Sequence, residues 1–187
     1  MKENHKRCTL PSVLEEPAIA IPDELQKAFQ DHHGLVFRTA YRITGNAGDA
    51  EDVLQTVFLR LIRRGERADQ LKSPESYLRR AAINAALDVI RSRQADQTVP
   101  LPEEPSGQLQ TAPSQASTFD LRRGLARAMA HLKPRSSEIF ALRFIEGLGN
   151  RQIAQMLGIS QVRVAVIVHR TRQQLRAELR PYLGDRS

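Results

Sequence analysis

Cysteine, tryptophan and long apolar runs are scarce or missing in this chain of 187 residues. It has one cysteine, no tryptophan, and an aromatic content of 5%. The single thiol of Cys8 cannot form an internal disulfide or, by itself, a cysteine-based zinc site. No stretch approaches eighteen consecutive apolar residues, and no apolar segment typical of a secretory signal follows the charged residues 1–7. We therefore expect a cytoplasmic protein without membrane insertion.

Signatures of catalysis and of β-strands are missing as well. The sequence has no phosphate-binding glycine loop, no Gly-x-Ser-x-Gly elbow and no His-Glu-x-x-His motif. His32 and His33 have no sequence partners that would complete a metal site. No alternating apolar run lies between hairpin turn signals. The sequence thus predicts an all-α protein that is not an enzyme, with no catalytic residue, no metal site and no cofactor.

Positive charge is concentrated in the C-terminal third. The formal net charge is +7, yet residues 1–118 hold 15 Lys and Arg against 16 Asp and Glu. Residues 119–187 hold 13 against 5. Such an excess favours a polyanionic partner, because binding of phosphates releases counterions. On charge alone, a basic surface that only aids solubility is the alternative.

Apolar residues at helical spacing divide the chain into two units. The first unit is predicted at residues 22–94 and the second at residues 119–187. Residues 95–118 between them are rich in proline and polar residues, which is typical of a flexible linker. Residues 1–21 are predicted to be a flexible N-terminal tail. The predicted fold is two small helical domains joined by a linker, whose composition does not decide whether the domains pack together.

Three helices are expected in the first unit. The first spans roughly residues 23–43. The second spans residues 49–64, where one continuous apolar stripe begins with acids and ends with arginines, as the helix dipole favours. The third should begin with Ser73 as its N-cap and Pro74 at its first position, and continue to Arg91.

A helix-turn-helix is predicted at residues 150–169. Gly158 would form the turn with a positive φ angle, Ser160 would N-cap the second helix, and Val164 would face the core. The second helix of such a motif enters the major groove, where its outward N-terminal residues meet base edges. By spacing, these residues are Ser160, Gln161, Arg163, Ala165, Val166 and His169, followed by Arg170 and Arg172 for phosphates. A helical pair without a role in DNA binding is the alternative.

Several segments, taken in order, carry a resemblance to a known family. Residues 49–61 resemble region 2.2 of bacterial sigma factors, and residues 76–91 resemble regions 2.3 and 2.4. Residues 132–135 and 140–147 resemble region 4.1, and the helix-turn-helix resembles region 4.2. The chain is similar to the extracytoplasmic-function group (group 4) of sigma-70-type RNA polymerase sigma factors.

The resemblance implies a function for each unit. Residues 22–94 would be sigma region 2, which binds core polymerase and recognises and melts the −10 element. Residues 119–187 would be sigma region 4, which reads the −35 element. The implied partners are the beta and beta-prime subunits of core RNA polymerase, promoter DNA and an anti-sigma factor that relays an extracytoplasmic or stress signal. The free protein would be a monomer.

The resemblance also assigns roles to individual residues. Those implied to contact core polymerase are Asp49, Glu51, Asp52, Gln55 and Phe58. Those implied at the −10 element are Tyr77, Arg79, Arg80, Asn84, Asp88 and Arg91. Those implied at the −35 element are Ser160, Gln161, Arg163, His169, Arg170 and Arg172. Without the resemblance, the acids would be an ordinary helix start and Tyr77 a core residue.

The expected recognition helix departs from the family pattern. Two cations typical of the family are replaced by Ala165 and Ile167, while Tyr77 and Gln152 stand where the family often has Trp and Glu. Exposed Ala and Val side chains can contact thymine methyl groups but cannot bind guanine, so this face could instead bind a protein. Two rival functions follow: a free-standing transcriptional repressor or activator, and a sigma-like decoy that sequesters a regulator.

Overall fold

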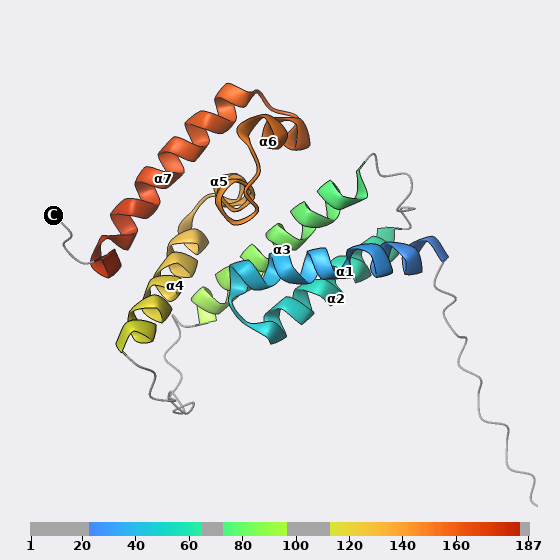
Figure 1. Cartoon of the computed structure of the whole chain (residues 1–187), viewed down its shortest axis with the longest axis horizontal. Coiled ribbons are helices and arrows are strands. Elements are labelled where there is room, and N and C mark those ends of the chain that lie inside the picture. Colours follow the sequence, from blue (N-terminus) through green and yellow to red (C-terminus); the bar gives the residue numbers. More distant parts are fainter. Residues whose placement is uncertain (1–22, 65–72, 97–112, 184–187) are drawn as a thin grey trace, which may run out of the picture.

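The computed structural model describes residues 23–64, 73–96 and 113–183, and every regular element within these ranges is helical (Figure 1). The N-terminal half holds α1 (Asp23–Thr44), α2 (Ala47–Arg64) and α3 (Pro74–Asp96). The C-terminal half holds α4 (Pro113–His131), α5 (Pro134–Phe140), the π-helical turn η2 (Ala141–Ile145), α6 (Asn150–Leu157) and α7 (Gln161–Leu183). The prediction of an all-α fold is confirmed. The predicted tail lies outside the described residues.

Two helices extend into the segment predicted to be a linker. The last turn of α3 ends at Asp96, and α4 begins at Pro113. Proline suits the first turn of a helix, where its missing N–H group has no intrahelical partner in any case. No other helix-breaking residue follows Pro113 until Gly124, so this proline starts a helix. The remainder of the predicted linker, residues 97–112, lies outside the described residues.

Local capping residues define the helices of the N-terminal bundle. Gly45, with φ of +69°, ends α1 and donates its N–H to the Tyr41 carbonyl at 2.8 Å. Asn46 N-caps α2, because its Oδ1 accepts a hydrogen bond from the Asp49 N–H at 3.1 Å. Ser73 acts as predicted at the start of α3, where its Oγ accepts the Ser76 N–H at 3.4 Å.

Helices α4 to α7 form the second half, in which α4 packs along α7. Gly124 permits this close approach, since a Cβ atom there would lie 2.9 Å from the ring of Tyr182. Among the described helices, none is long and apolar enough to span a bilayer.

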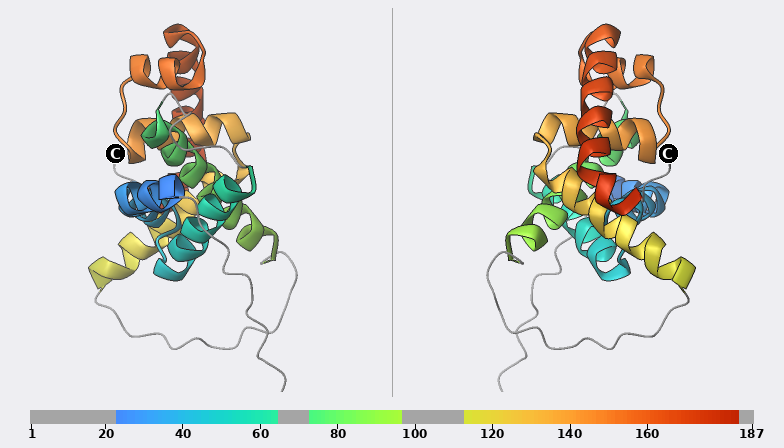
Figure 2. Two further views of the ribbon diagram at one scale, coloured as in Figure 1. Left: turned by 90° about the vertical axis from the view of Figure 1, so that its right-hand side faces the viewer. Right: turned by 90° about the vertical axis from the view of Figure 1, so that its left-hand side faces the viewer.

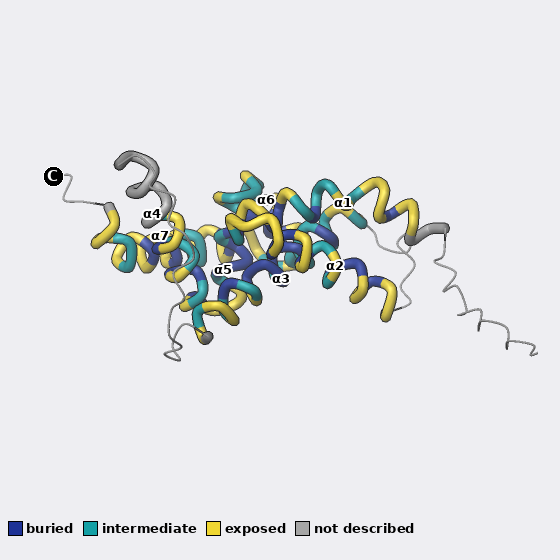
Figure 3. Tube along the Cα trace, turned by 90° about the horizontal axis from the view of Figure 1, so that it is seen from below, coloured by how far each residue is buried: buried dark blue, intermediate teal, exposed yellow. Residues whose placement is uncertain are grey.

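Helix α3 lies between the two halves and contacts α1 and α2 on one side and α4 and α5 on the other (Figures 1 and 2). Three consecutive residues, Ala85, Ala86 and Leu87, are buried. Because successive helical residues point about 100° apart, their burial requires neighbours on more than one face of the helix. Small alanines allow both neighbours to approach closely, and buried positions are found along α1, α2, α3 and α5 (Figure 3). The apolar side chains of both halves form one continuous cluster.

Truncation of Leu61 should destabilise the N-terminal bundle strongly. Its side chain in α2 is fully buried. We expect Leu61→Ala to lower the free energy of unfolding by about 2–5 kcal/mol, because it removes buried methyl groups and leaves a cavity. Urea unfolding followed by circular dichroism measures this loss. The matched control is Leu59→Ala on the exposed face of the same helix, which should change stability by less than about 0.5 kcal/mol. Equal effects of the two variants would contradict the assigned core.

Candidate functional site

The outer face of α2 carries the exposed polar side chains of Glu51, Asp52 and Gln55. Glu51 and Gln55 are four residues apart and so lie on the same side of the helix, and Asp52 directly follows Glu51. Among the described helices, the main packing partners of α2 are α1 and α3. The structure therefore leaves an acidic, polar surface of α2 open to a partner.

Two of the residues assigned to this surface by resemblance lie in the interior instead. Phe58 is only 6% exposed and packs edge-to-face on Phe29, with ring centroids 4.9 Å apart. Its position beside Val57 on the apolar stripe accounts for its burial. Asp49 is also buried and forms an ion pair with Arg93 of α3. Asp49 and Phe58 thus hold α2 in the bundle, and they are not part of the candidate partner surface.

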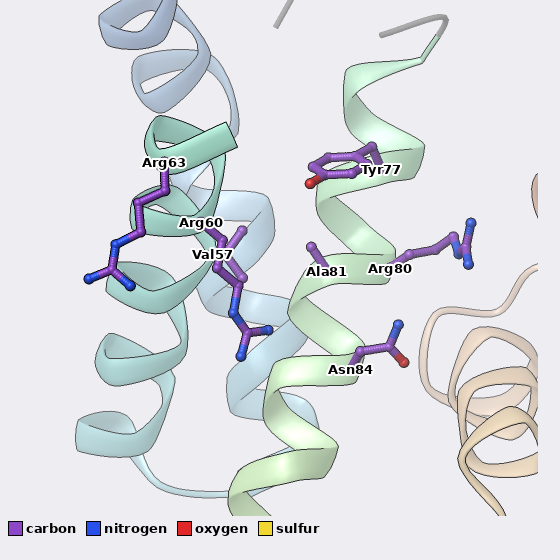
Figure 4. A pocket seen from close by; sticks show the side chains of 7 residues that line it. All are labelled: Val57, Arg60, Arg63, Tyr77, Arg80, Ala81 and Asn84. Carbon is purple, nitrogen blue, oxygen red and sulfur yellow. The ribbon is translucent and has the colours of Figure 1, made fainter. Parts of the chain in front are cut away.

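A hollow of about 580 Å³ lies between α2 and α3 (Figure 4). Its lining combines three cations with an aromatic ring and an amide: Val57, Arg60, Arg63, Tyr77, Arg80, Ala81 and Asn84. Tyr77 is partly buried beside it, so it has contacts with the core and with the hollow. Cations, an aromatic face and an amide together suit a single-stranded nucleic acid, whose phosphates, bases and base edges they can bind.

Arg60 and Arg63 were not identified as site residues from the sequence. At the end of a predicted helix, arginines are explained by the helix dipole alone. Their spacing of three residues places them on one side of α2, and the structure brings that side to α3. Neither arginine pairs with a carboxylate within the described part of the chain. The pairing of two helices, and not the sequence of either, creates the hollow.

Several polar residues of α3 contact the C-terminal half. Arg80 donates from Nε to Glu138 Oε1 at 2.9 Å, and Asn84 Nδ2 lies 3.5 Å from the same oxygen. In Figure 4 both side chains point away from α2 and toward the C-terminal half. Arg79 forms an ion pair with Glu146.

Arg91 completes this row of contacts near the end of α3. It donates to Ser137 Oγ at 2.8 Å and to the exposed Asp88 at 3.1 Å. The six residues assigned to −10 DNA thus lie along one helix, and four of them contact α5 or the residue that follows η2. Their partners Ser137, Glu138 and Glu146 were not identified from the sequence, because such contacts between distant segments leave no local pattern.

The helix-turn-helix has the geometry that its sequence predicts. Gly158 has φ of +63° and ends α6, and Ser160 Oγ accepts the Arg163 N–H at 3.2 Å as the N-cap of α7. Ile153 of α6 and Val164 of α7 are fully buried where the two helices meet. The inner side of the first turns of α7 is therefore packed on α6, and the outer side is exposed to solvent.

The residues assigned to −35 DNA are exposed on α7 and at its N-cap. They are Ser160, Gln161, Arg163, His169, Arg170 and Arg172. Val162, which the sequence analysis did not single out, is 74% exposed at the centre of this face. Its spacing from Val166, on the side opposite the buried Val164 and Leu175, is the signal that could have identified it.

Two family models match the chain in the order of its two halves. Residues 28–95 match Sigma-70 region 2, and residues 122–175 match Sigma-70, region 4. Together the two models cover more than half of the chain. It belongs to the sigma-70 family.

Curated relatives place this sigma factor in the extracytoplasmic-function (ECF) group. It is 34% identical to the ECF RNA polymerase sigma factor SigE of Mycolicibacterium smegmatis over 91% of this chain and 66% of the relative. It is 28% identical to the RNA polymerase sigma-E factor of Streptomyces coelicolor over 83% of this chain and 86% of the relative. Its fold is similar to that of the sigma factor RpoE crystallised with the anti-sigma factor NepR from Bartonella quintana, with a TM-score of 0.48 and 16% identity over 88% of this chain and 99% of that one.

Proposed function

We propose that this sigma factor binds core RNA polymerase through the exposed face of α2 and places promoter DNA on α3 and α7. The observation that carries the proposal is the hollow between α2 and α3, which is lined by Tyr77, Asn84 and three arginines. A surface for polymerase and a surface for a melted strand would thus lie on neighbouring sides of one bundle.

The proposed −10 contact uses the chemistry of this hollow. Asn84 has both a donor and an acceptor for the edge of an unpaired base, and the ring of Tyr77 can stack on one. Arg60, Arg63 and Arg80 can bind the phosphates that flank such a base, because guanidinium groups bind phosphate oxygens strongly. Captured bases cannot return to the duplex, which would keep the −10 element open.

The proposed −35 contact uses the first turns of α7. Gln161 and Arg163 would reach base edges in the major groove, while Arg170 and Arg172 would contact phosphates. Ser160 would fix the helix end and could add a contact of its own. Because phosphate contacts dominate the affinity, binding of this half to duplex DNA should weaken steeply as salt increases.

The same proposal covers how the protein acts and is controlled. It would act without catalysis, in the cytoplasm with core polymerase, and an anti-sigma factor would hold it inactive until an extracytoplasmic or stress signal arrives. Membership of the ECF group supports these points.

Reconstituted transcription tests the proposed function. The purified full chain and bacterial core RNA polymerase are incubated with a library of duplex and pre-melted promoter fragments. We expect transcripts with defined starts that require this protein. A stable homodimer that binds a palindrome without polymerase, or binding of a protein regulator with no promoter specificity, would contradict it and favour a repressor or a decoy.

A further inference from the structure

The two buried glutamates of the C-terminal half are held by cations of the N-terminal half. The side chains of Glu138 and Glu146 are 5% and 1% exposed. Glu138 accepts from Arg80 at 2.9 Å and also from Arg135 of its own helix at 2.9 Å. A carboxylate removed from water is stable only when charged or polar donors replace its hydration.

Glu146 is bound by three residues from two helices of the N-terminal half. It pairs with Arg79 of α3, lies 3.6 Å from Arg42 of α1, and accepts a hydrogen bond from Thr39 Oγ1 at 3.1 Å. The π-helical turn η2 precedes it directly, and the Glu146 N–H donates to the Ala141 carbonyl at 3.0 Å. Turns of this kind are rare and often mark functional positions.

These carboxylates therefore occupy the groups that a DNA strand would use. A glutamate carboxylate and a phosphate both present anionic oxygens to an arginine, so the two compete for the same guanidinium groups. Glu138 lies on Arg80 and Asn84, which line the hollow proposed for the −10 element. In contrast, the acidic face of α2 and the first turns of α7 stay exposed.

We infer that Glu138 and Glu146 lock the free protein in a closed form that excludes the −10 strand until the C-terminal half moves away. The DNA part of this inference depends on the proposed function, whereas the closure itself does not. Polymerase can dock on α2 while the protein is closed, so docking can precede opening. The free protein would then have little affinity for single-stranded DNA in the absence of polymerase.

Fluorescence energy transfer between the two halves measures the closure. Dyes on Ser92→Cys of α3 and Gln173→Cys of α7, both exposed, report the distance in a Cys8→Ser background. We expect Glu138→Gln/Glu146→Gln to increase the open fraction about tenfold, and Glu138→Lys/Glu146→Lys to increase it further through repulsion from the arginines. The matched control is Glu178→Gln, whose partners His131 and Gln174 lie in its own half, and it should leave the transfer efficiency unchanged.

A salt titration of the wild-type chain tests the same closure without a mutation. Raising the salt concentration from about 50 mM to about 500 mM should increase the open fraction, because the arginines Arg42 and Arg80 of these ion pairs are partly exposed and salt therefore screens them. The result decides the question even if a glutamate variant folds poorly. Transfer efficiency that changes neither with salt nor in the glutamate variants would overturn the lock.

Binding of a −10 oligonucleotide tests the exclusion. The probe is the non-template strand around the −10 position of a promoter obtained by reconstituted transcription. For a ligand that binds only the open form, the apparent Kd equals the intrinsic Kd divided by the open fraction, so affinity and open fraction should increase by the same factor. Opening without a gain in affinity would overturn the exclusion. If no variant binds the probe even with core polymerase, the proposed promoter function is wrong. The energy-transfer measurement still tests the closure in that case.

A second inference comes from the outer face of α7. Val162 is 74% exposed and Val166 is 42% exposed, and the exposed Ala165 lies between them. Exposed valines do not stabilise a helix, because β-branched residues lower helix propensity and apolar surface is costly in water. Their presence on this face therefore indicates a role in binding. Arg163 and Arg170 flank the patch, which favours a polyanion over an apolar protein surface as its partner.

We propose that Val162 and Val166 read thymine methyl groups in the −35 element, a role that depends on the proposed function. Replacing thymine by deoxyuridine removes only the methyl group, so it isolates this contact. With a duplex selected by the reconstituted holoenzyme, each substitution at a contacted thymine should weaken binding roughly fivefold.

The matched variant is Val162→Ala/Val166→Ala, which should bind thymine and deoxyuridine duplexes equally. Equal loss in wild type and variant, or no loss in wild type, would overturn methyl reading. Absence of any duplex binding by the holoenzyme would count against the promoter function itself.

Discussion

The double charge reversal Glu51→Lys/Asp52→Lys should reduce the affinity of the sigma factor for core polymerase roughly 100-fold or more. Both side chains are exposed on α2, whose main packing partners among the described helices are α1 and α3. If they meet a basic surface of polymerase, reversal replaces attraction by repulsion at the same positions. Transcription from the promoters of this sigma factor should fall by a similar factor when the concentration of core is limiting.

Fluorescence anisotropy of the labelled sigma factor, titrated with core polymerase, measures this change. Asp31→Lys is the matched control, since it reverses an exposed acid on α1 outside the proposed surface. Circular dichroism should give identical melting curves for the three proteins. Equal binding by wild type and the double variant would remove α2 from the polymerase interface.

The second large effect is expected at the hollow between α2 and α3. Arg80→Ala/Asn84→Ala removes a phosphate ligand and the amide proposed to hold an unpaired base. We expect promoter opening to fall roughly 100-fold, because base recognition and backbone binding are lost together. Permanganate reactivity of unpaired thymines at the −10 element measures the opening.

This variant should also separate DNA binding from closure. Without Arg80 and Asn84, Glu138 keeps only Arg135 among the partners described above, so the closed form should loosen while promoter opening is lost. A pre-melted template should restore part of the transcription, since it removes the need to capture bases from a duplex. Arg127→Ala on the exposed face of α4 is the control. A variant that opens promoters normally would refute the assignment of this hollow to the −10 strand.

Local chemistry in the sequence was sufficient to predict several elements. Ser73 and Pro74 start α3, and Gly158 and Ser160 make the turn and cap of the helix-turn-helix, because these preferences depend on the backbone of a few adjacent residues. The boundary between linker and helix at Pro113 was missed because proline both interrupts and starts helices.

Helical periodicity identified the apolar face of each helix, but it did not always show which side chains remain accessible to a partner. Phe58 lies on the apolar stripe of α2, and the resemblance assigned it to the contact with polymerase. In the structure, Phe29 of α1 packs against its ring. Asp49 suited a helix start, and only the approach of α3 supplied Arg93 as its partner. Burial of this kind depends on a second element, so a single helix cannot reveal it.

The sequence by itself determined that the protein is helical, that a basic second half carries a helix-turn-helix, and that α2 and α3 resemble sigma region 2. Only the tertiary structure decided how the halves meet. The alanines of α3 admit a helix on both sides, and Glu138 and Glu146 then reach arginines more than fifty residues away in the chain. A carboxylate has no preferred partner at a fixed sequence distance outside a helix, so this pairing exists only once the halves are packed together.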